Sequence, residues 1–374
     1  MQSPVKSPYQ LVHNGTLPEI FSMSSEERLS KQFAVLSKER ALRATCEVLI
    51  RSDSVFDTPV LRGLLSHTNI AVTDVATGEP YAACVEVALV EQTRTWLAGE
   101  GAMPASITVH SPAEIANAYD LNLRKREAPA AHRLTPDNAR EVEWKLFMTA
   151  YKGVTDFITK FWWPRPAFRV TRWCAAQGIS PNQVTAVSAI LVLASLFLFM
   201  QGFFWLGMLS AWIMTFLDTV DGKLARVTLT SSPIGNIFDH GIDLIHPPFW
   251  YWAWAAGLAA SDTPLHEGWF TPLMWMMFGG YIVGRLCEGY FSRRYKMHIH
   301  VWRRIDSSFR LILARRNPNM LLLQLSLLVA RPDWGLLAVV AWTLVCLVLQ
   351  CIQLAQAEVA RMQGGPLSSW LDRA

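Results

Sequence analysis

The sequence carries little charge for its length and few cysteines. Charged residues make up 17% of the 374 residues and the formal net charge is +4, so the composition does not indicate a nucleic-acid partner. The six cysteines show no Cys-x-x-Cys spacing, which argues against a zinc site or a disulfide framework and favours buried free thiols. The N-terminus has no charged segment followed by an apolar one, so we expect no cleaved signal peptide.

Apolar and aromatic residues are abundant instead. Hydrophobic residues reach 51%, with 16 tryptophans and 18 phenylalanines, which is more than a soluble protein usually carries. A membrane helix needs about 20 apolar residues. Counted on that basis, the sequence predicts six transmembrane helices, at residues 184–200, 203–221, 239–260, 272–290, 319–330 and 334–355.

The placement of lysines and arginines predicts the orientation of these helices. Positive residues precede the first span, follow the second and follow the fourth, whereas the opposite connections hold few. By the positive-inside rule, both termini and the region after the second span face the cytoplasm. We therefore expect an integral membrane protein, in the bacterial inner membrane, with its active site on the cytoplasmic side.

Residues 1–130 alternate short strand-like and helix-like stretches, which predicts a small cytoplasmic α/β domain. We expect strands at 47–50, 69–75, 82–90 and 93–97, and helices at 24–38, 58–65 and 111–122. Residues 138–168 carry aromatic and basic residues at helical spacing, which is typical of an amphipathic helix at the membrane interface, ended by Pro164 and Pro166. The predicted organisation is 1–130 α/β domain, 131–181 linker and interfacial helix, 182–360 six-helix membrane domain and 361–374 cytoplasmic tail.

One stretch places four carboxylates between two hydrophobic segments. Asp218 and Asp221 are three residues apart, and Asp239 and Asp243 are four apart. On helices each pair shares one face, and two antiparallel helices would bring the pairs together. Four carboxylates in one pocket do not all stay ionised without positive charge, and hard divalent cations are their usual partners. The spacing therefore predicts a dinuclear Mg²⁺ or Mn²⁺ site acting on a phosphate ester, with Arg226 suited to bind phosphate.

The pattern Asp-x2-Asp-Gly-x2-Ala-Arg-x8-Gly-x3-Asp-x3-Asp runs from Asp218 to Asp243. It resembles the signature of the CDP-alcohol phosphatidyltransferase family (class I), and every fixed position is present. The stretch Pro181-Asn182-Gln-Val-Thr185 is similar to the start of that family's first membrane helix. The resemblance covers about residues 140–360 and implies transfer of a phosphate group, such as phosphatidyl, from a CDP-linked donor to an alcohol, with release of CMP.

The resemblance also implies roles for single residues. Asp218, Asp221 and Asp239 become metal ligands, and Asp243 becomes both a ligand and the base that takes the hydroxyl proton. Small and polar residues beside them would bind the donor nucleotide: Gly222, Ala225, Arg226, Gly235, Asn182 and Thr185. The implied cofactors are two Mg²⁺ or Mn²⁺ ions. The expected partners are CDP-diacylglycerol or a CDP-alcohol, an alcohol acceptor, membrane lipids and a second copy in a homodimer.

The acceptor site is less well defined by the sequence. Arg285 beside Glu288 is a candidate ion pair within the fourth span. With further arginines it forms a candidate anion pocket for a phosphorylated alcohol: Arg293, Arg294, Arg310, Arg315 and Arg316. The alternative is that these arginines signal topology or contact anionic lipid headgroups. His240 and His246 are interpreted as structural.

The N-terminal region carries a second resemblance. Val48-Leu-Ile-Arg-Ser-Asp53 is similar to the nucleotidyltransferase strand that ends in a metal-binding aspartate, and some family members carry such a domain, as in inositol-phosphate cytidylyltransferases. No glycine-rich nucleotide loop is present, so we interpret this domain as a reduced, inactive relative or as a scaffold. The arrangement points to an inositol-phosphate-type acceptor. Two other classes stay open for the whole chain, a cation-binding membrane transporter and a noncatalytic membrane scaffold.

Overall fold

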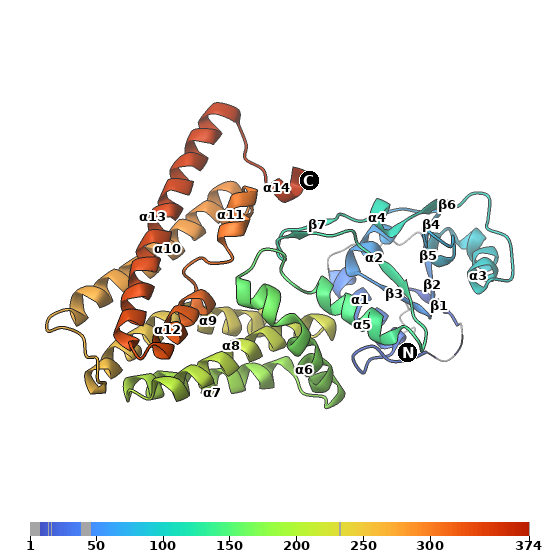
Figure 1. Cartoon of the computed structure of the whole chain (residues 1–374). Helices are drawn as coiled ribbons and strands as arrows, with labels where there is room; N and C mark the ends of the chain where they lie inside the picture. Colours follow the sequence, from blue (N-terminus) through green and yellow to red (C-terminus); the bar gives the residue numbers. More distant parts are fainter. Residues whose placement is uncertain (1–7, 14, 16, 39–45, 232, 374) are drawn as a thin grey trace, which may run out of the picture. The chain divides into compact units, whose positions relative to one another are not determined.

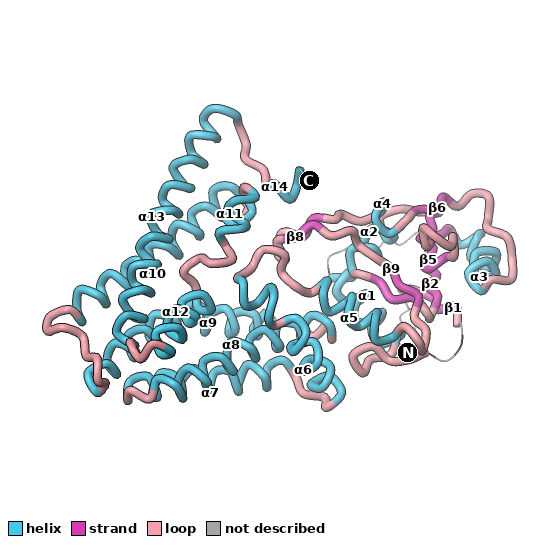
Figure 2. The backbone as a smooth tube through the Cα atoms, in the orientation of Figure 1, coloured by secondary structure: helices cyan, strands magenta, loops and turns pink. Residues whose placement is uncertain are grey.

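The computed structural model describes residues 8–13, 15, 17–38, 46–231 and 233–373, with the backbone alone at 233–234, 236–240 and 373. The chain divides into two compact units (Figure 1). The first contains Met1–Asp120, Arg126–Ala150 and Val227–Leu229, and the second contains Leu121–Lys125, Tyr151–Arg226 and Thr230–Ala374. Strands of the main sheet belong to the first unit, while the second is built largely of helices (Figure 2).

A five-stranded mixed sheet organises the first unit. Its spatial order is β1-β2-β5-β4-β6, and β5 pairs antiparallel with both β2 and β4. The two edge strands, β1 and β6, run parallel to their neighbours. The strand bounds are β1 Gln10–Val12, β2 Glu47–Arg51, β4 Ile70–Thr73, β5 Pro80–Val85 and β6 Thr108–His110. The predicted small α/β region is thus confirmed.

Both faces of this sheet are covered, because successive residues of β2 point to opposite sides. Val48 and Ile50 pack with Phe33 of α1, whereas Leu49 packs with Leu97 of α3. The helices of the unit are α1 Ser25–Lys38, α2 Thr58–Leu65, α3 Val90–Ala98, α4 Pro112–Ile115 and α5 Ala139–Thr149. Shorter strand pairs complete it: β3 Ser54–Phe56 with β9 Ala131–Arg133, and β7 Tyr119–Asp120 with β8 Lys125–Arg126.

Four element predictions were wrong. The strand expected at 82–90 ends at Val85, because residues 87–89 form a 3-10 helix and α3 begins at Val90. Residues 93–97, expected as a strand, lie in α3, where Val90, Thr93 and Leu97 form one buried helical face. The helix expected at 111–122 ends after Ile115. The single amphipathic helix expected at 138–168 is divided: α5 packs Val142, Leu146 and Phe147 into the first unit, and a new helix, α6 Pro164–Ala176, begins at the proline expected to end it. Proline suits the first turn of a helix because a backbone N–H at that position would have no acceptor within the helix.

Long helices build the second unit. They are α7 Pro181–Met200, α8 Phe204–Val227, α9 Pro233–Gly257, α10 Phe270–Tyr295, α12 Arg316–Leu328 and α13 Pro332–Gly364, with the short α11 Arg304–Phe309 and α14 Trp370–Arg373. Within the described residues two of them, α7 and α13, are long and apolar enough to cross a membrane. α12 has only 13 residues, below the ~20 that a span needs. The six predicted spans are therefore not confirmed.

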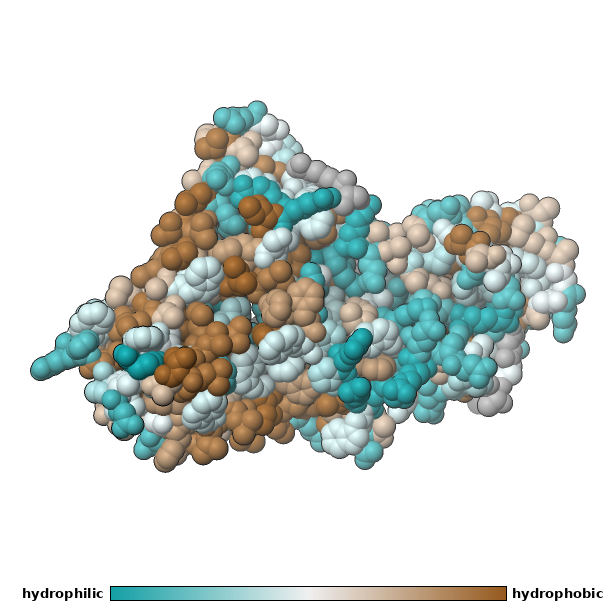
Figure 3. Space-filling model, viewed as in Figure 1, coloured by the Kyte–Doolittle hydropathy of each residue, from teal (hydrophilic) through white to brown (hydrophobic). Residues whose placement is uncertain are grey.

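Many apolar side chains of this unit point outward. Ile190, Leu193 and Phe197 of α7 are more than half exposed, as is Val348 of α13. On the face shown in Figure 3, hydrophobic side chains gather along these two helices. Exposed apolar surface on this scale marks contact with lipid or with another protein.

The core of the second unit is rich in tryptophan from α9. Trp250 and Trp254 are almost fully buried, and each satisfies its indole N–H at a backbone carbonyl. Trp250 Nε1 donates to Val192 of α7, and Trp254 Nε1 donates to Pro332 at the start of α13, both at 3.0 Å. The tryptophans that follow the signature thus bind α9 to α7 and α13 by hydrogen bonds.

Gly257 allows the end of α9 to touch the end of α7. A Cβ atom at this position would collide with the carbonyl oxygen of Phe199 and would lie 3.0 Å from the Gly202 nitrogen. We expect Gly257→Ala to destabilise the protein by about 1–3 kcal/mol, since backbone atoms must shift. Thermal unfolding of the detergent-solubilised protein would measure this. Gly279→Ala in α10 is the matched control because its Cβ meets nothing within 4 Å, and an equal loss in both variants would contradict the explanation.

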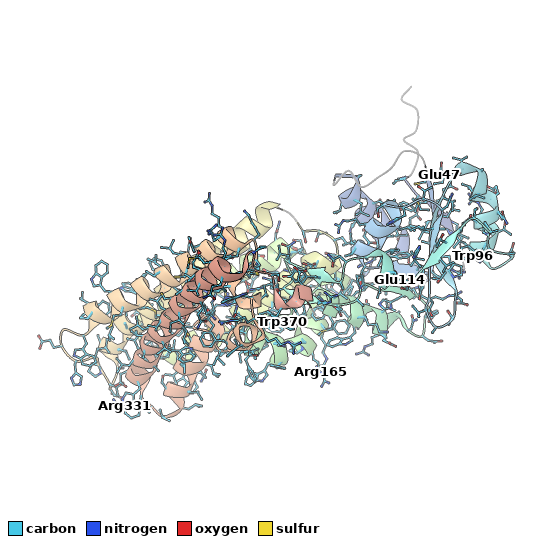
Figure 4. The ribbon with its side chains drawn as sticks, turned by 90° about the horizontal axis from the view of Figure 1, so that it is seen from above. Glu47, Trp96, Glu114, Arg165, Arg331 and Trp370 are labelled. Carbon is cyan, nitrogen blue, oxygen red and sulfur yellow. The ribbon has the colours of Figure 1, made fainter. Side chains whose placement is uncertain are left out.

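The last residues pack against the segment between α10 and α12. Ser369 Oγ donates to the carbonyl of Val301 at 2.6 Å, and the Trp370 backbone N–H donates to Trp302 at 3.2 Å. Trp370 Nε1 also donates to Ser307 Oγ at 2.9 Å. Figure 4 labels Arg331, just before α13, and Trp370, beyond its other end. Ser369 and Trp370 are therefore part of the packed structure of this unit.

Candidate functional site

A cavity of about 1010 Å³ lies within the second unit. Its walls come from α7, α8, α9, α10 and α12, together with the segments that precede α6 and follow α10. The cavity brings together most of the residues that the signature singled out: Asn182, Thr185, Asp218, Asp221, Gly222, Ala225, Arg226, Gly235 and Asp243. The side chains of Asp239 and His240 lie outside the described residues.

Two aspartates from different helices meet at one guanidinium. Asp218 of α8 accepts a hydrogen bond from Arg316 Nη2 at 2.6 Å, and Asp243 of α9 accepts one from Arg316 Nη1. Arg316 is the first residue of α12, which lies far from both in the sequence. The two carboxylates therefore converge, as helical spacing of the signature predicted.

Asp221 occupies a more enclosed position. It is 3% exposed, and its Oδ2 accepts a hydrogen bond from Thr185 Oγ1 at 2.6 Å. Its Oδ1 is buried and has no hydrogen-bond partner in the described part of the chain. A buried carboxylate oxygen without a partner is costly, so a bound cation would stabilise this side chain.

The chemistry of these donors suits a hard divalent cation. The cavity offers carboxylate oxygens from Asp218, Asp221 and Asp243, and Mg²⁺ and Mn²⁺ prefer oxygen ligands. Among the described side chains, however, no group of three His, Cys, Asp or Glu residues is already arranged around one point. Arg316 lies between two of the aspartates, and the side chain of the fourth is outside the described residues. The residue types thus fit a metal, while ion binding itself stays a prediction.

The other signature residues leave room beside the aspartates. A Cβ on Gly222 would meet only Arg226 Nη2, at 3.9 Å, so this part of α8 is open to a ligand. Arg226, Ala225 and Gly235 line the same cavity. A glycine, an alanine and a guanidinium side by side suit close approach of a phosphate group.

A second group of charged residues surrounds Glu288 of α10. Its carboxylate pairs with Arg285 at 3.2 Å and with Arg315, and His300 Nε2 lies 3.4 Å from it. Gln350 of α13 donates to it at 2.9 Å. The predicted pair of Arg285 and Glu288 is therefore present, inside a larger network that the sequence did not reveal.

Further cationic side chains line the cavity, among them Arg310 and Lys152. Arg310 is 9% exposed, and its Nε and Nη1 atoms find no hydrogen-bond partner among described residues. Lys152 also lines the cavity, and burial there, together with the charges of Arg124 and Arg226, lowers the pKa of its amine to about 8. Arg293, the third predicted acceptor residue, is not among the described residues that line the cavity. Lys152 and Arg310 thus offer positive charge to an anion.

Several lining residues were missed from the sequence. Lys152 and Asp156 precede α6, and Asn317 of α12 donates to Asp156 Oδ1 at 3.0 Å. The sequence placed Lys152 and Asp156 only in an amphipathic helix. It made Arg316 a candidate for the anion pocket of the acceptor, but no sequence signal indicated its contact with the signature aspartates.

Asp53 of the first unit is held by two arginines. Arg51 donates to it at 3.0 and 2.8 Å, and Arg133 Nε donates at 3.1 Å. Burial alone would raise the pKa of Asp53, but these two guanidinium groups lower it below its usual value. Its oxygens are already satisfied, so the strand that resembles a nucleotidyltransferase metal strand carries a structural ion pair here.

The geometry defines a helical domain whose cavity gathers aspartates, small residues and guanidinium groups, as expected of an enzyme that handles phosphate esters. Comparison with known families gives the same class: residues 178–314 match CDP-alcohol phosphatidyltransferase. Residues 178–314 are thus similar to the CDP-alcohol phosphatidyltransferase family, whose members are integral membrane proteins.

Three curated relatives illustrate the similarity. Cholinephosphotransferase 1 of Gallus gallus is 31% identical over 122 residues, which is 31% of this chain and 36% of that protein. The bifunctional IPC transferase and DIPP synthase of Thermococcus kodakarensis is 28% identical over 142 residues, 34% of this chain and 32% of that protein. Archaetidylinositol phosphate synthase of Pyrococcus horikoshii is 36% identical over 80 residues, 21% and 42%. The chain spans less than half the length of each of these relatives.

Proposed function

We propose that this protein is a membrane-embedded CDP-alcohol phosphotransferase that joins an alcohol to the phosphate of a CDP-linked donor and releases CMP. The observation that carries the proposal is the shared cavity of Asp218, Asp221, Gly222, Arg226 and Asp243. Two relatives, a cholinephosphotransferase and an archaetidylinositol phosphate synthase, support this class of reaction.

The residues would divide the reaction among them. Asp218, Asp221, Asp239 and Asp243 would hold two Mg²⁺ or Mn²⁺ ions, which neutralise the pyrophosphate and the leaving phosphate when bound. Arg226 would bind a donor phosphate, and Gly222, Ala225 and Gly235 would leave space for the nucleotide, beside Asn182 and Thr185. Asp243 would take the proton of the acceptor hydroxyl as its oxygen attacks phosphorus and the bond to CMP breaks.

The acceptor is proposed to be a phosphorylated alcohol. Lys152 and Arg310 offer positive charge in the cavity, and Arg285 is partly neutralised by Glu288. An anionic group on the acceptor would satisfy the buried guanidinium atoms of Arg310. Arg293 is left out of this site and is assigned to the positive cluster that sets topology.

The membrane arrangement is proposed from the same helices. α7, α8, α9, α10, α12 and α13 would form six spans, with α12 extended by the segment before it, and the basic loop after α10 would face the cytoplasm. The homodimer and the bacterial inner membrane stay predictions from the sequence, and the relatives described above come from a bird and two archaea.

The test is CMP release by the purified protein in detergent or lipid vesicles. We expect release that needs both Mg²⁺ or Mn²⁺ and an acceptor, with CDP-diacylglycerol as donor and inositol phosphate as the first acceptor tried. Inositol, glycerol phosphate and diacylglycerol with a soluble CDP-alcohol donor are the comparison arms. Folded protein that releases no CMP with any donor would overturn the proposal and favour a transporter or scaffold.

A further inference from the structure

Arg316 touches the reacting side of the proposed site and has no role in the signature. Its two terminal nitrogens reach two different carboxylates, Asp218 at 2.6 Å and Asp243. The side chain of Arg316 is 14% exposed and that of Asp218 is 16% exposed, so the pair is shielded from water. A shielded ion pair is strong only while both partners stay together.

The neighbouring arginine makes a useful contrast. Arg315 precedes Arg316 in the chain and pairs with Glu288. The two adjacent guanidinium groups thus bind different carboxylates: Arg315 binds Glu288 of α10, and Arg316 binds the signature aspartates. This separation distinguishes a specific contact of Arg316 from the general positive charge of the region.

The position of Arg316 is electrostatically unfavourable apart from these contacts. It is the first residue of α12, and the positive end of the helix dipole disfavours a cation at a helix N-terminus. Its Nε atom is also buried without a hydrogen-bond partner among the described residues. The two aspartates offset these costs, so Arg316 is held where it is by the charges of the site.

We propose that Arg316 competes with divalent cations for Asp218 and Asp243, and that it binds a phosphate oxygen of the donor once a cation has displaced it. Only the binding of a donor phosphate by Arg316 rests on the proposed function. A guanidinium bridging two carboxylates uses the same oxygen lone pairs that a divalent ion needs. The freed fork of donors then lies beside the place where the transferred phosphate would sit, and a planar guanidinium suits phosphate recognition.

Direct binding of Mn²⁺ tests the first half without any enzyme assay. Free Mn²⁺ is measured by electron paramagnetic resonance during titration of the wild type, Arg316→Gln, Arg316→Lys and Arg315→Gln. We expect Arg316→Gln to bind Mn²⁺ roughly tenfold tighter, because the competing charge is removed from its ligands. Arg315→Gln should stay within about twofold of the wild type, because its partner is Glu288.

The lysine variant keeps the test decisive if the glutamine variant folds poorly. A single ammonium cannot bridge both carboxylates as a guanidinium does, so Arg316→Lys should bind Mn²⁺ about threefold tighter than the wild type. Unchanged or weaker binding in a folded variant at position 316 would overturn the competition, as would an equal gain in Arg315→Gln. Thermal unfolding and size-exclusion elution report folding.

A CMP-release assay distinguishes failure of the Arg316 proposal from failure of the proposed function. We expect Arg316→Gln to bind Mn²⁺ more tightly and yet release CMP at least about tenfold more slowly at saturating Mn²⁺, since one phosphate contact is lost. Tighter binding with an unchanged rate would overturn the phosphate role alone. If the wild type also released no CMP, the proposed function would fail, while tighter Mn²⁺ binding would still support the competition.

Discussion

Replacing Asp243 with asparagine should reduce the rate of CMP release by at least about a hundredfold. The substitution keeps the size of the side chain but removes the proton acceptor, and a positioned base contributes about 10²–10⁴ in rate. It also removes one of the two acids that hold Arg316. The measurement is the turnover number at saturating donor, acceptor and Mn²⁺.

The control for this loss is another Asp→Asn change in the same unit. Asp262 lies in the exposed connection between α9 and α10 and is not among the described residues that line the cavity. Asp262→Asn should keep the wild-type rate and unfolding temperature. A folded Asp243→Asn protein with more than a tenth of the wild-type rate would rule out Asp243 as the base.

Replacing Asp221 with asparagine should weaken Mn²⁺ binding by at least about a hundredfold. Asp221 is buried, and its Oδ1 has no other partner among the residues described. Loss of partners that only orient a metal ligand costs about 10–100-fold in affinity, so loss of the ligand itself should cost more. Mn²⁺ titration, as for Arg316, measures the change directly.

Thr185 provides a graded comparison for that result. Its hydroxyl donates to Asp221 Oδ2 at 2.6 Å, so Thr185→Val should loosen the carboxylate without removing it. We expect about a tenfold loss of Mn²⁺ affinity, between the wild type and Asp221→Asn. Equal affinities for all three proteins would place the ions elsewhere, and the signature aspartates would then need another explanation.

The sequence predicted the structure well where the outcome depends on residues that are close together in the chain. Aspartates three and four residues apart share a helical face, and an antiparallel arrangement of the two helices predicted that Asp218 and Asp243 lie in one region. Long apolar stretches likewise indicated α7 to α10 and α13, although the spans themselves were not confirmed. The short apolar strand predicted at 47–50 is likewise present as β2 Glu47–Arg51.

The sequence was a poor guide where distant segments decide the outcome. Nothing local to Arg316 or Lys152 indicates that they line the cavity with Asp218, since these residues come from three separate segments. The prediction of one amphipathic helix at 138–168 was wrong. Apolar residues at helical spacing can face the core of a domain as well as a membrane, and α5 packs into the first unit. Residues 93–97 contain β-branched residues, which favour a strand. They nevertheless form part of α3, because Thr93 and Leu97 pack on the sheet from one helical face.

The packing of Ser369 and Trp370 makes the choice of affinity tag an experimental variable. Their hydrogen bonds hold Val301, Trp302 and Ser307, in the segment that also presents His298 and His300 to the cavity. A tag fused directly after residue 374 would begin within a few residues of these contacts. Kinetic work on the acceptor pocket should therefore use protein tagged at the other end, or compare rates before and after the C-terminal tag is cleaved.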